Sequence, residues 1–292
     1  MNKVNPNLSI QFRKQRTIGK KVFFSGIGIH TCREVYLQFC PAEEGTGIVF
    51  KRVDLPDQPV IPALVQYVQD TARSTTIGIK NVHIHTVEHV LSAVKSFGID
   101  NLCIEISNIE PPVGNGSADV FVQMIEEVGV IEQKEEIPVV KIGEPLYWSE
   151  GDIHLVALPS DEYRISYTLS YPENPFLRGQ FFSLVLNPET FKKEIAPCRT
   201  FSLYEEISML IDRGLIKGGS LDNAVVIKKD AILSKGGLFF PDEMARHKIL
   251  DLIGDLSLVG FDFTAHIIAI RSGHFSNNAL AKMLFNYIVK EN

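Results

Sequence analysis

Three short segments of the chain carry side chains that bind metals or move protons. The first is 85–89, His-Thr-Val-Glu-His, which has the form H-x-x-E-H. In inverted zincins this pattern places two zinc-binding histidines on one helical face. Thr86, however, is a good helix N-cap before a run of apolar residues at helical spacing. If Thr86 caps the helix, His85 lies outside it and cannot share a face with His89, which argues against the zincin interpretation.

The second segment, 246–255, places polar side chains along one side of a predicted helix. His247, Asp251 and Asp255 recur every four residues beside an apolar arc. Because residues i and i+4 lie one above the other on a helix, His247 and Asp251 can coordinate one metal ion together. The simpler alternative is a solvated helix face, on which such a pair contributes roughly a few tenths of a kcal/mol.

The third segment, 271–274, is Arg-Ser-Gly-His and follows a predicted strand. We expect it to form a loop, and loops at strand ends often hold catalytic groups. A histidine with no role is the alternative there, as it is for His89 taken alone.

Taken together, the three segments predict a catalytic zinc site with His89, His247 and Asp251 as ligands. Three protein ligands leave the fourth position open for water, which distinguishes catalytic from structural zinc. Zinc lowers the pKa of its bound water to about 7 and polarises a carbonyl group. Glu88 is then the candidate base, and His274, held by Asp255, the candidate acid for a leaving amine. The chemistry is metal-assisted amide hydrolysis.

The elements that would position these residues occur in a similar order twice. The first half reads as strands at 20–24, 34–39 and 47–51, a helix at 86–97, a strand at 101–106, a loop at 111–117 and a helix at 118–128. The second half reads as strands at 139–142, 153–158, 164–170 and 180–186, helices at 203–213 and 242–259, a strand at 265–270 and a helix at 277–289.

This order predicts an α+β fold of two similar domains. Residues 129–138 mix turn formers with a charge cluster and form the predicted boundary. The N-terminal domain, 1–130, would supply Glu88 and His89. The C-terminal domain, 136–292, would supply His247, Asp251 and His274.

Composition narrows the class of protein. The chain has 292 residues, 45% hydrophobic and 22% charged, which excludes a disordered chain or a rod. Its 29 basic and 35 acidic residues give a net charge of −6, which argues against a nucleic-acid partner but allows a small anionic ligand. No apolar run reaches the roughly 18–20 residues of a membrane span, and residues 1–16 lack the apolar core of a signal peptide.

We therefore expect a cytoplasmic protein without stable membrane insertion. Its four cysteines lie far apart in the sequence, which predicts reduced thiols rather than disulfides or a cysteine-based zinc site: Cys32, Cys40, Cys103 and Cys198. The absence of heptads or a long amphipathic seam predicts a monomer.

Eight short motifs, spread over nearly the whole chain, occur together in one order. They are 25–31 (SGIGIHT), 86–89 (TVEH), 98–101 (GIDN), 115–118 (NGSA), 199–201 (RTF), 218–220 (GGS), 246–255 (RHKILDLIGD) and 272–274 (SGH). The chain resembles the UDP-3-O-acyl-N-acetylglucosamine deacetylases, the zinc enzymes of the committed step of lipid A synthesis, because these motifs occur in the same order in that family. The resemblance implies two α+β domains, each with a small insertion, and an active site between them.

The resemblance also implies a role for each matching residue. It makes His89, His247 and Asp251 the zinc ligands, Glu88 the general base, and His274, paired with Asp255, the acid. Thr200 would hydrogen-bond the oxyanion, and Lys248 and Phe201 would bind the nucleotide sugar. An insertion at about 204–226 would line a passage for the acyl chain, and the matching residues are Ile207, Leu210, Gly219, Ser220, Ala224 and Val226.

The implied substrate is UDP-3-O-acyl-N-acetylglucosamine, and the implied cofactor is one Zn²⁺ ion, although Fe²⁺ fits the same ligands. Two positions depart from the family pattern: Cys32 replaces a usual glycine, and Asn115 a usual aspartate. His85 is not required by the family pattern and could bind a second zinc ion.

Two other functions compete with this one. An H-x-x-E-H metallopeptidase would use His85, Glu88 and His89, whereas a binding protein would use the His/Asp stripes only as salt-bridged surfaces. One equivalent of zinc together with amine release from the nucleotide sugar would separate the three.

Overall fold

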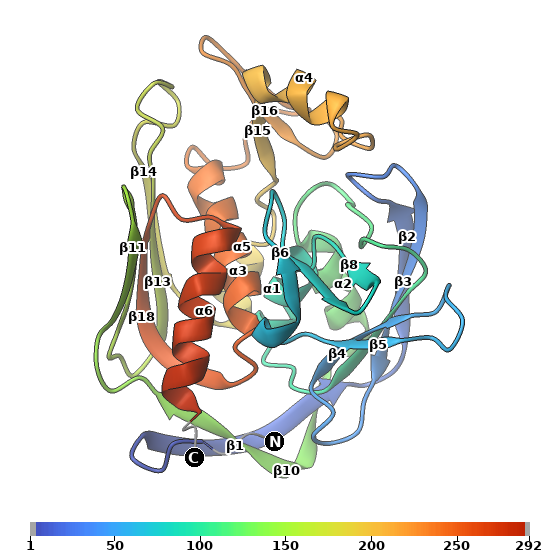
Figure 1. The fold of residues 1–292 in the computed structure, drawn as a ribbon, viewed down its shortest axis with the longest axis vertical. Helices are drawn as coiled ribbons and strands as arrows, with labels where there is room; N and C mark the ends of the chain where they lie inside the picture. The colour runs from blue at the N-terminus through green and yellow to red at the C-terminus, as the bar shows by residue number, and fades with distance from the viewer. Residues whose placement is uncertain (1–3, 290–292) are drawn as a thin grey trace.

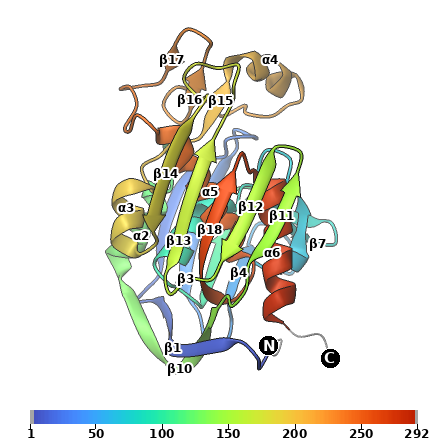
Figure 2. The same ribbon diagram turned by 90° about the vertical axis from the view of Figure 1, so that its left-hand side faces the viewer.

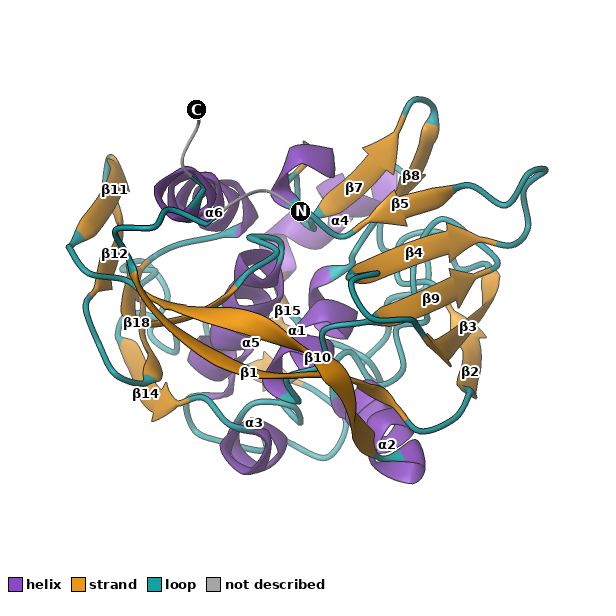
Figure 3. Cartoon of the chain, turned by 90° about the horizontal axis from the view of Figure 1, so that it is seen from below, coloured by secondary structure: helices purple, strands orange, loops and turns teal. Residues whose placement is uncertain are grey.

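Two β-sheets enclose a layer of helices (Figure 1). The computed structural model describes residues 4–289. Seen from below, most helices lie between the two sheets, and the long strands β1 and β10 cross beneath them (Figure 3). Helices packed on sheets with both parallel and antiparallel pairs confirm the predicted α+β class.

The larger sheet has seven strands. They are β1 (Ser9–Ile18), β10 (Val130–Lys141), β11 (Leu146–Glu150), β12 (Ile153–Leu158), β13 (Tyr163–Leu169), β14 (Gln180–Val185) and β18 (Asp262–Ile270). Strand β18 is central: it pairs in parallel with β10 and β13 and antiparallel with β12. Alternate residues of β18, from Phe263 to Ala269, are buried in the core, as expected for a strand with one covered face.

The second sheet has five strands, all from the first half of the chain. They are β2 (Val22–Ile27), β3 (Glu34–Pro41), β4 (Ile48–Arg52), β5 (Val60–Pro62) and β9 (Leu102–Ile106). Strand β9 pairs antiparallel with β3 and in parallel with β4. The predicted strands at 20–24, 34–39, 47–51 and 101–106 are confirmed with ends shifted by a few residues.

Two three-stranded sheets complete the β-structure, and the sequence predicted neither. One consists of β6 (Val68–Asp70), β7 (Thr76–Ile79) and β8 (Val82–Ile84), and the 3₁₀ turn η1 (Val65–Tyr67) precedes it. The other consists of β15 (Phe201–Leu203), β16 (Val225–Ile227) and β17 (Ile232–Leu233), which lie near α4 at the top of the molecule (Figure 2). Strands of two to four residues are too short to show an alternating pattern.

Six α-helices pack on these sheets within the described residues. They are α1 (Glu88–Ser96), α2 (Asp119–Val128), α3 (Pro188–Glu194), α4 (Tyr204–Asp212), α5 (Glu243–Ser257) and α6 (His274–Ile288). Helices α1 and α5 pack directly on each other. At Gly254 of α5 the backbones are so close that an added Cβ would lie 2.1 Å from the carbonyl oxygen of Glu88. Only glycine permits this approach.

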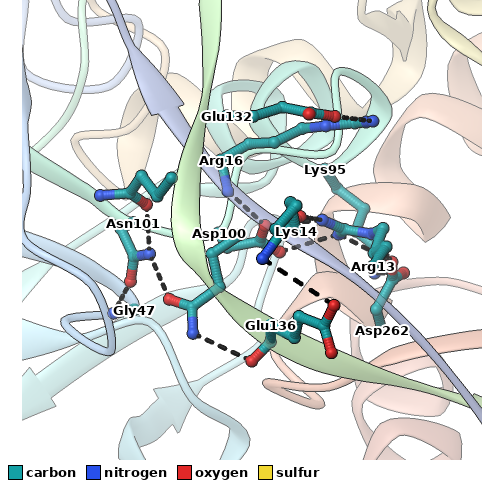
Figure 4. A network of polar contacts seen from close by, with 12 residues as sticks. Arg13, Lys14, Arg16, Gly47, Lys95, Asp100, Asn101, Glu132, Glu136 and Asp262 are labelled. Carbon is teal, nitrogen blue, oxygen red and sulfur yellow. Dashed lines mark hydrogen bonds and ion pairs between the residues drawn. The ribbon is translucent and has the colours of Figure 1, made fainter.

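The segment predicted as a domain boundary, 129–138, lies mostly in β10, which pairs with β1. Arg13 on β1 forms ion pairs with Asp100 at 2.7 Å and with Asp262 on β18 at 2.8 Å (Figure 4). Lys95 of α1 also contacts Asp262 at 2.8 Å. The β1–β10 pair therefore connects elements of both halves of the chain, and the division into two domains stays a prediction.

Across residues 4–289, the helices are too short or too polar to traverse a bilayer.

Candidate active site

A cavity of about 610 Å³ lies between the first turn of α1, helix α5, the start of α6 and the segment that contains α4. Almost every residue singled out in the sequence lines it. They are Glu88, His89, Thr200, Phe201, Ile207, Leu210, Gly219, Ser220, Ala224, Val226, His247, Lys248, Asp251 and His274. Asp255 lies behind this surface and contacts His274.

His89, His247 and Asp251 form one buried cluster whose candidate ligand atoms all lie within 4.8 Å of one another. Asp251 Oδ1 is 3.4 Å from His247 Nε2 and 3.6 Å from His89 Nε2. Helix α5 supplies two of the residues one turn apart, and the first turn of α1 supplies the third. The close approach of the helices at Gly254 brings these two sources together.

The protonation states of this cluster suit a divalent metal. Burial lowers the pKa of His247 to about 3, so its ring is neutral at pH 7. Its Nδ1 lies 3.0 Å from the carbonyl oxygen of Cys198, which fixes the Nδ1–H tautomer and leaves the Nε2 lone pair facing Asp251. Burial opposes ionisation of Asp251, but Lys248 and the neighbouring histidines together outweigh it and hold the pKa well below its usual range. Neutral imidazoles and a carboxylate are the ligands that zinc prefers.

Glu88 is the first residue of α1 and is buried beside the cluster. Burial raises the pKa of its carboxyl. Oε2 accepts the backbone N–H of Thr75 at 3.0 Å, and Oε1 lies 3.9 Å from His274 Nε2. A carboxylate with a raised pKa, with one oxygen held and the other near a histidine, is suited to proton transfer.

The prediction that Thr86 caps this helix is wrong. Val87 occupies the N-cap position without a side-chain capping bond, and Thr86 has a φ of +54°. The left-handed conformation is rare for a β-branched residue and differs from the extended backbone of an N-cap. Thr86 instead forms part of the cavity lining just before the helix. His85 nevertheless lies outside α1, as expected, because the helix begins at Glu88.

The predicted loop is confirmed at 271–273, but His274 is the first residue of α6, so the expectation for His274 itself is wrong. The helix begins three residues before the predicted 277, and Ser276 and Gly273 close a hydrogen-bonded turn at its start. Oδ2 of the buried Asp255 accepts a hydrogen bond from Nδ1 of His274, at a distance of 2.9 Å. Burial opposes charge on this ring, but Asp255 and then Glu88 outweigh it and raise the pKa of His274 to about 9. The imidazolium is therefore populated at neutral pH.

Lys248 places a cation at one wall of the cavity. Its Nζ lies 2.7 Å from Asp251 Oδ2 and 5.5 Å from the centre of the Phe201 ring. Burial disfavours the charged ammonium, but Asp251 outweighs it and raises the pKa of Lys248. Thr200 lies between Cys198 and Phe201, and its backbone is fixed by bonds to Gly116 and Val225.

The far wall of the cavity is apolar and comes from α4 and the strands that follow it. Ile207, Leu210, Ala224 and Val226 line this wall, and Ile211, Ile216 and Leu221 add to it. Because the apolar wall adjoins the charged cluster, the cavity can hold a ligand with one polar and one apolar end.

The two departures from the family pattern lie in turns. Cys32 is exposed and has a φ of +56°, a conformation that favours glycine. Asn115 accepts the hydroxyl of Ser117 at 2.7 Å. His85 contacts the hydroxyl of Thr76 at 2.7 Å and does not belong to the metal-ligating cluster found in residues 4–289.

Three residues of the site were missed by sequence reasoning: Thr75, Asn277 and Asn278. Asn277 Nδ2 donates to Asp255 Oδ2 at 2.8 Å, and Asn278 Nδ2 donates to Thr75 Oγ1 at 3.1 Å. Two adjacent asparagines at the start of the predicted helix, both of them buried in the structure, could have signalled a polar network. Thr75 gave no signal, because it lies in a short polar segment before a strand that was not predicted.

The structure thus combines an α+β fold with a His-His-Asp cluster that could hold a metal ion, and a buried glutamate and histidine lie beside that cluster. The family model of UDP-3-O-acyl N-acetylglycosamine deacetylase matches residues 15–286. The chain belongs to this family.

Relatives from Chlamydia match this chain over almost their full length. The UDP-3-O-acyl-N-acetylglucosamine deacetylase of Chlamydia felis is 52% identical over 272 residues, which cover 93% of this chain and 97% of the relative. The enzymes of the same name from Chlamydia pneumoniae and Chlamydia trachomatis serovar L2 are 50% and 48% identical, over 93% and 96% of this chain and 97% of each relative.

Proposed function

We propose that this chain hydrolyses the acetamide of UDP-3-O-acyl-N-acetylglucosamine to the free amine and acetate, the committed step of lipid A synthesis. The observation that carries the proposal is the convergence, in one cavity, of a three-ligand metal cluster, an acid–base pair and an apolar wall. Membership of the deacetylase family supports the same activity.

His89, His247 and Asp251 would hold one Zn²⁺ ion. When bound there, zinc supplies Lewis acidity, which polarises the acetamide carbonyl and makes a water molecule more acidic. The neutral ring of His247, the ionised carboxylate of Asp251 and the burial of all three residues fit this ion, whose role depends on a vacant fourth position.

Glu88 would take the proton of the attacking water. Its raised pKa makes it a stronger base than an ordinary carboxylate. The hydroxyl of Thr200, on the cavity wall, would donate a hydrogen bond to the oxyanion that develops on the acetyl group.

His274 would protonate the leaving nitrogen as the C–N bond breaks. Asp255 accepts its Nδ1–H, so Nε2 carries the proton that is delivered. The carboxylate of Asp255 also stabilises the positive charge on the His274 ring before the proton is transferred. Water thus supplies the oxygen of acetate, and the amine gains the proton held by His274.

The substrate would lie across the cavity with its two ends on different surfaces. Lys248 and Phe201 would contact the nucleotide sugar, because a lysine is a flexible point charge for a phosphate. The wall formed by Ile207, Leu210, Gly219, Ser220, Ala224 and Val226 would hold the acyl chain.

The proposal also covers the organisation of the chain. Residues 1–130, with Glu88 and His89, and residues 136–292, with the other site residues, would form two α+β domains that share the cavity. The protein would act as a cytoplasmic monomer.

The metallopeptidase alternative has less support. It needs His85 and His89 on one face of a helix, whereas α1 begins after His85, whose ring contacts Thr76. The binding-protein alternative does not explain why a buried glutamate and a buried histidine lie beside the cluster.

Metal analysis of purified variants, together with mass spectrometry of the nucleotide sugar, tests the proposal. His247→Ala and Asp251→Ala should lose tightly bound zinc and amine release. His85→Ala is the matched control and should retain both. Zinc loss in His85→Ala with retention in His247→Ala would contradict the site and favour the peptidase.

A further inference from the structure

Thr75 contacts both members of the proposed acid–base machinery. It is fully buried and lies directly before β7, in the loop that follows β6. Its backbone N–H donates to Glu88 Oε2 at 3.0 Å, and its hydroxyl donates to Asp255 Oδ1. One loop residue therefore contacts the candidate base and the carboxylate that holds the candidate acid.

The direction of the Thr75 hydroxyl proton follows from its partners. Asn278 Nδ2 donates to Thr75 Oγ1 at 3.1 Å, and an amide nitrogen cannot accept a hydrogen bond. The single hydroxyl proton is thus available for the carboxylate oxygen Oδ1 of Asp255, which accepts it. The hydrogen bonds therefore all run in one direction: Asn278 donates to Thr75, and Thr75 donates to Asp255.

The other oxygen of Asp255 is held in the same way. Oδ2 accepts Asn277 Nδ2 at 2.8 Å and His274 Nδ1 at 2.9 Å. With Thr75 on Oδ1, both oxygens have donors, which fixes the plane of the carboxylate. The ring of His274 takes its orientation from that plane.

The backbone of Thr75 adds a second constraint. Val87 N–H donates to the Thr75 carbonyl at 3.3 Å, so Thr75 is bonded to the first turn of α1 as well as to Glu88 itself. Through these hydrogen bonds and that to Asp255, Thr75 connects the start of α1 with Asp255 on α5.

We propose that Thr75 is a positioning residue that aligns Glu88 with the Asp255–His274 pair. The inference rests on the proposed deacetylation. Among the described residues, Thr75 is not part of the cavity lining, so it acts through Glu88 and Asp255 and not on the substrate. Its loss should reduce the rate of the proton transfers and leave substrate binding and the metal ligands in place.

The test compares Thr75→Val, which keeps the shape and the backbone N–H, with Thr75→Ser, which keeps the hydroxyl. Thr76→Val is the matched control, because it removes a buried hydroxyl from the next residue, where the partner is His85. All proteins are loaded with zinc and assayed for amine release, zinc content and thermal melting.

Thr75→Val should lower kcat roughly 10- to 100-fold with little change in KM or zinc content, the loss expected for a hydrogen bond to a charged group. Thr75→Ser should recover most of kcat, and Thr76→Val should retain it. If Thr75→Val does not fold, Asn278→Ala replaces it, and should lower kcat several-fold because the hydroxyl loses its orientation.

Equal kcat in wild type and Thr75→Val, or a loss that Thr75→Ser does not repair, would overturn the inference. In the replacement experiment, wild-type kcat in Asn278→Ala would do the same. A wild-type protein that releases no amine would instead overturn the proposed function.

Discussion

Gly254→Ala should separate the metal ligands without altering any of them. An added Cβ would lie 2.1 Å from the carbonyl oxygen of Glu88, whereas ordinary contact begins at 3.4 Å, so the backbones of α1 and α5 must part by about 1.3 Å. The atoms it meets are backbone atoms, which cannot rotate away as a flexible side chain would. Because alanine favours a helix over glycine by up to about 1 kcal/mol, propensity alone predicts stabilisation.

The close approach of the α1 and α5 backbones should instead make the substitution destabilising. Overpacking costs roughly 1–3 kcal/mol, so we expect a net loss of stability. The metal site should suffer more, because His89 moves with α1 while His247 and Asp251 move with α5. Metal–ligand distances tolerate only about ±0.2 Å, and losses of roughly 10- to 100-fold in zinc affinity follow even from indirect changes near ligands.

Competition with a zinc chelator measures the affinity, and thermal melting measures the stability. Gly179→Ala is the matched control, since an added Cβ there meets no atom within 4 Å. Zinc affinity and melting temperature of Gly254→Ala equal to those of wild type would refute the reasoning.

Three further predictions concern acid–base chemistry, substrate selection and acid stability. We proposed the imidazolium of His274 as the acid; burial opposes its charge, but Asp255 and Glu88 outweigh burial and raise its pKa to about 9, so activity should fall as pH rises through that value. His274→Ala should be slower by roughly 10²–10⁴ and should show a flattened basic limb in its pH–rate profile, and an unchanged limb would exclude His274 as the acid. Gly219→Leu or Ala224→Phe should lower kcat/KM for the long-acyl substrate by orders of magnitude, because each excluded CH₂ costs about 0.8 kcal/mol. The same substitutions should hardly affect kcat/KM for UDP-N-acetylglucosamine, and equal losses on both substrates would place the acyl passage elsewhere. Burial opposes the charge of Asp262, but Lys95 and Arg13 outweigh burial and lower the pKa of Asp262 to about 2. Asp262→Asn should therefore lower the free energy of unfolding by roughly 1–2 kcal/mol at pH 7. In urea denaturation, the difference between variant and wild type should vanish as pH falls from 4 towards 2.

The helices that hold the site were predictable because long amphipathic segments carry a periodic signal. The four-residue repeat of His247, Asp251 and Asp255 placed all three on one side of α5, as the structure has them. That repeat alone also fitted a solvated helix face, so the prediction of a metal cluster needed His89 from the first segment and the resemblance to the family.

The remaining parts depend on contacts between distant segments. The short strands β6 to β8 have no periodicity, so the sequence could not show that they carry Thr75 to Asp255, 180 residues away. Thr86 matched an N-cap by type, but the tertiary structure places it in a left-handed conformation. The need for glycine at 254 appears only when α1 is packed against α5.

Zinc titration of the metal-free protein, with mass spectrometry of UDP-3-O-acyl-N-acetylglucosamine, tests the central claim most directly. The account predicts no amine without metal, and an amine-forming rate that rises with zinc up to one equivalent per chain. Amine release at full rate by the metal-free protein, or none at one equivalent of zinc, would contradict it.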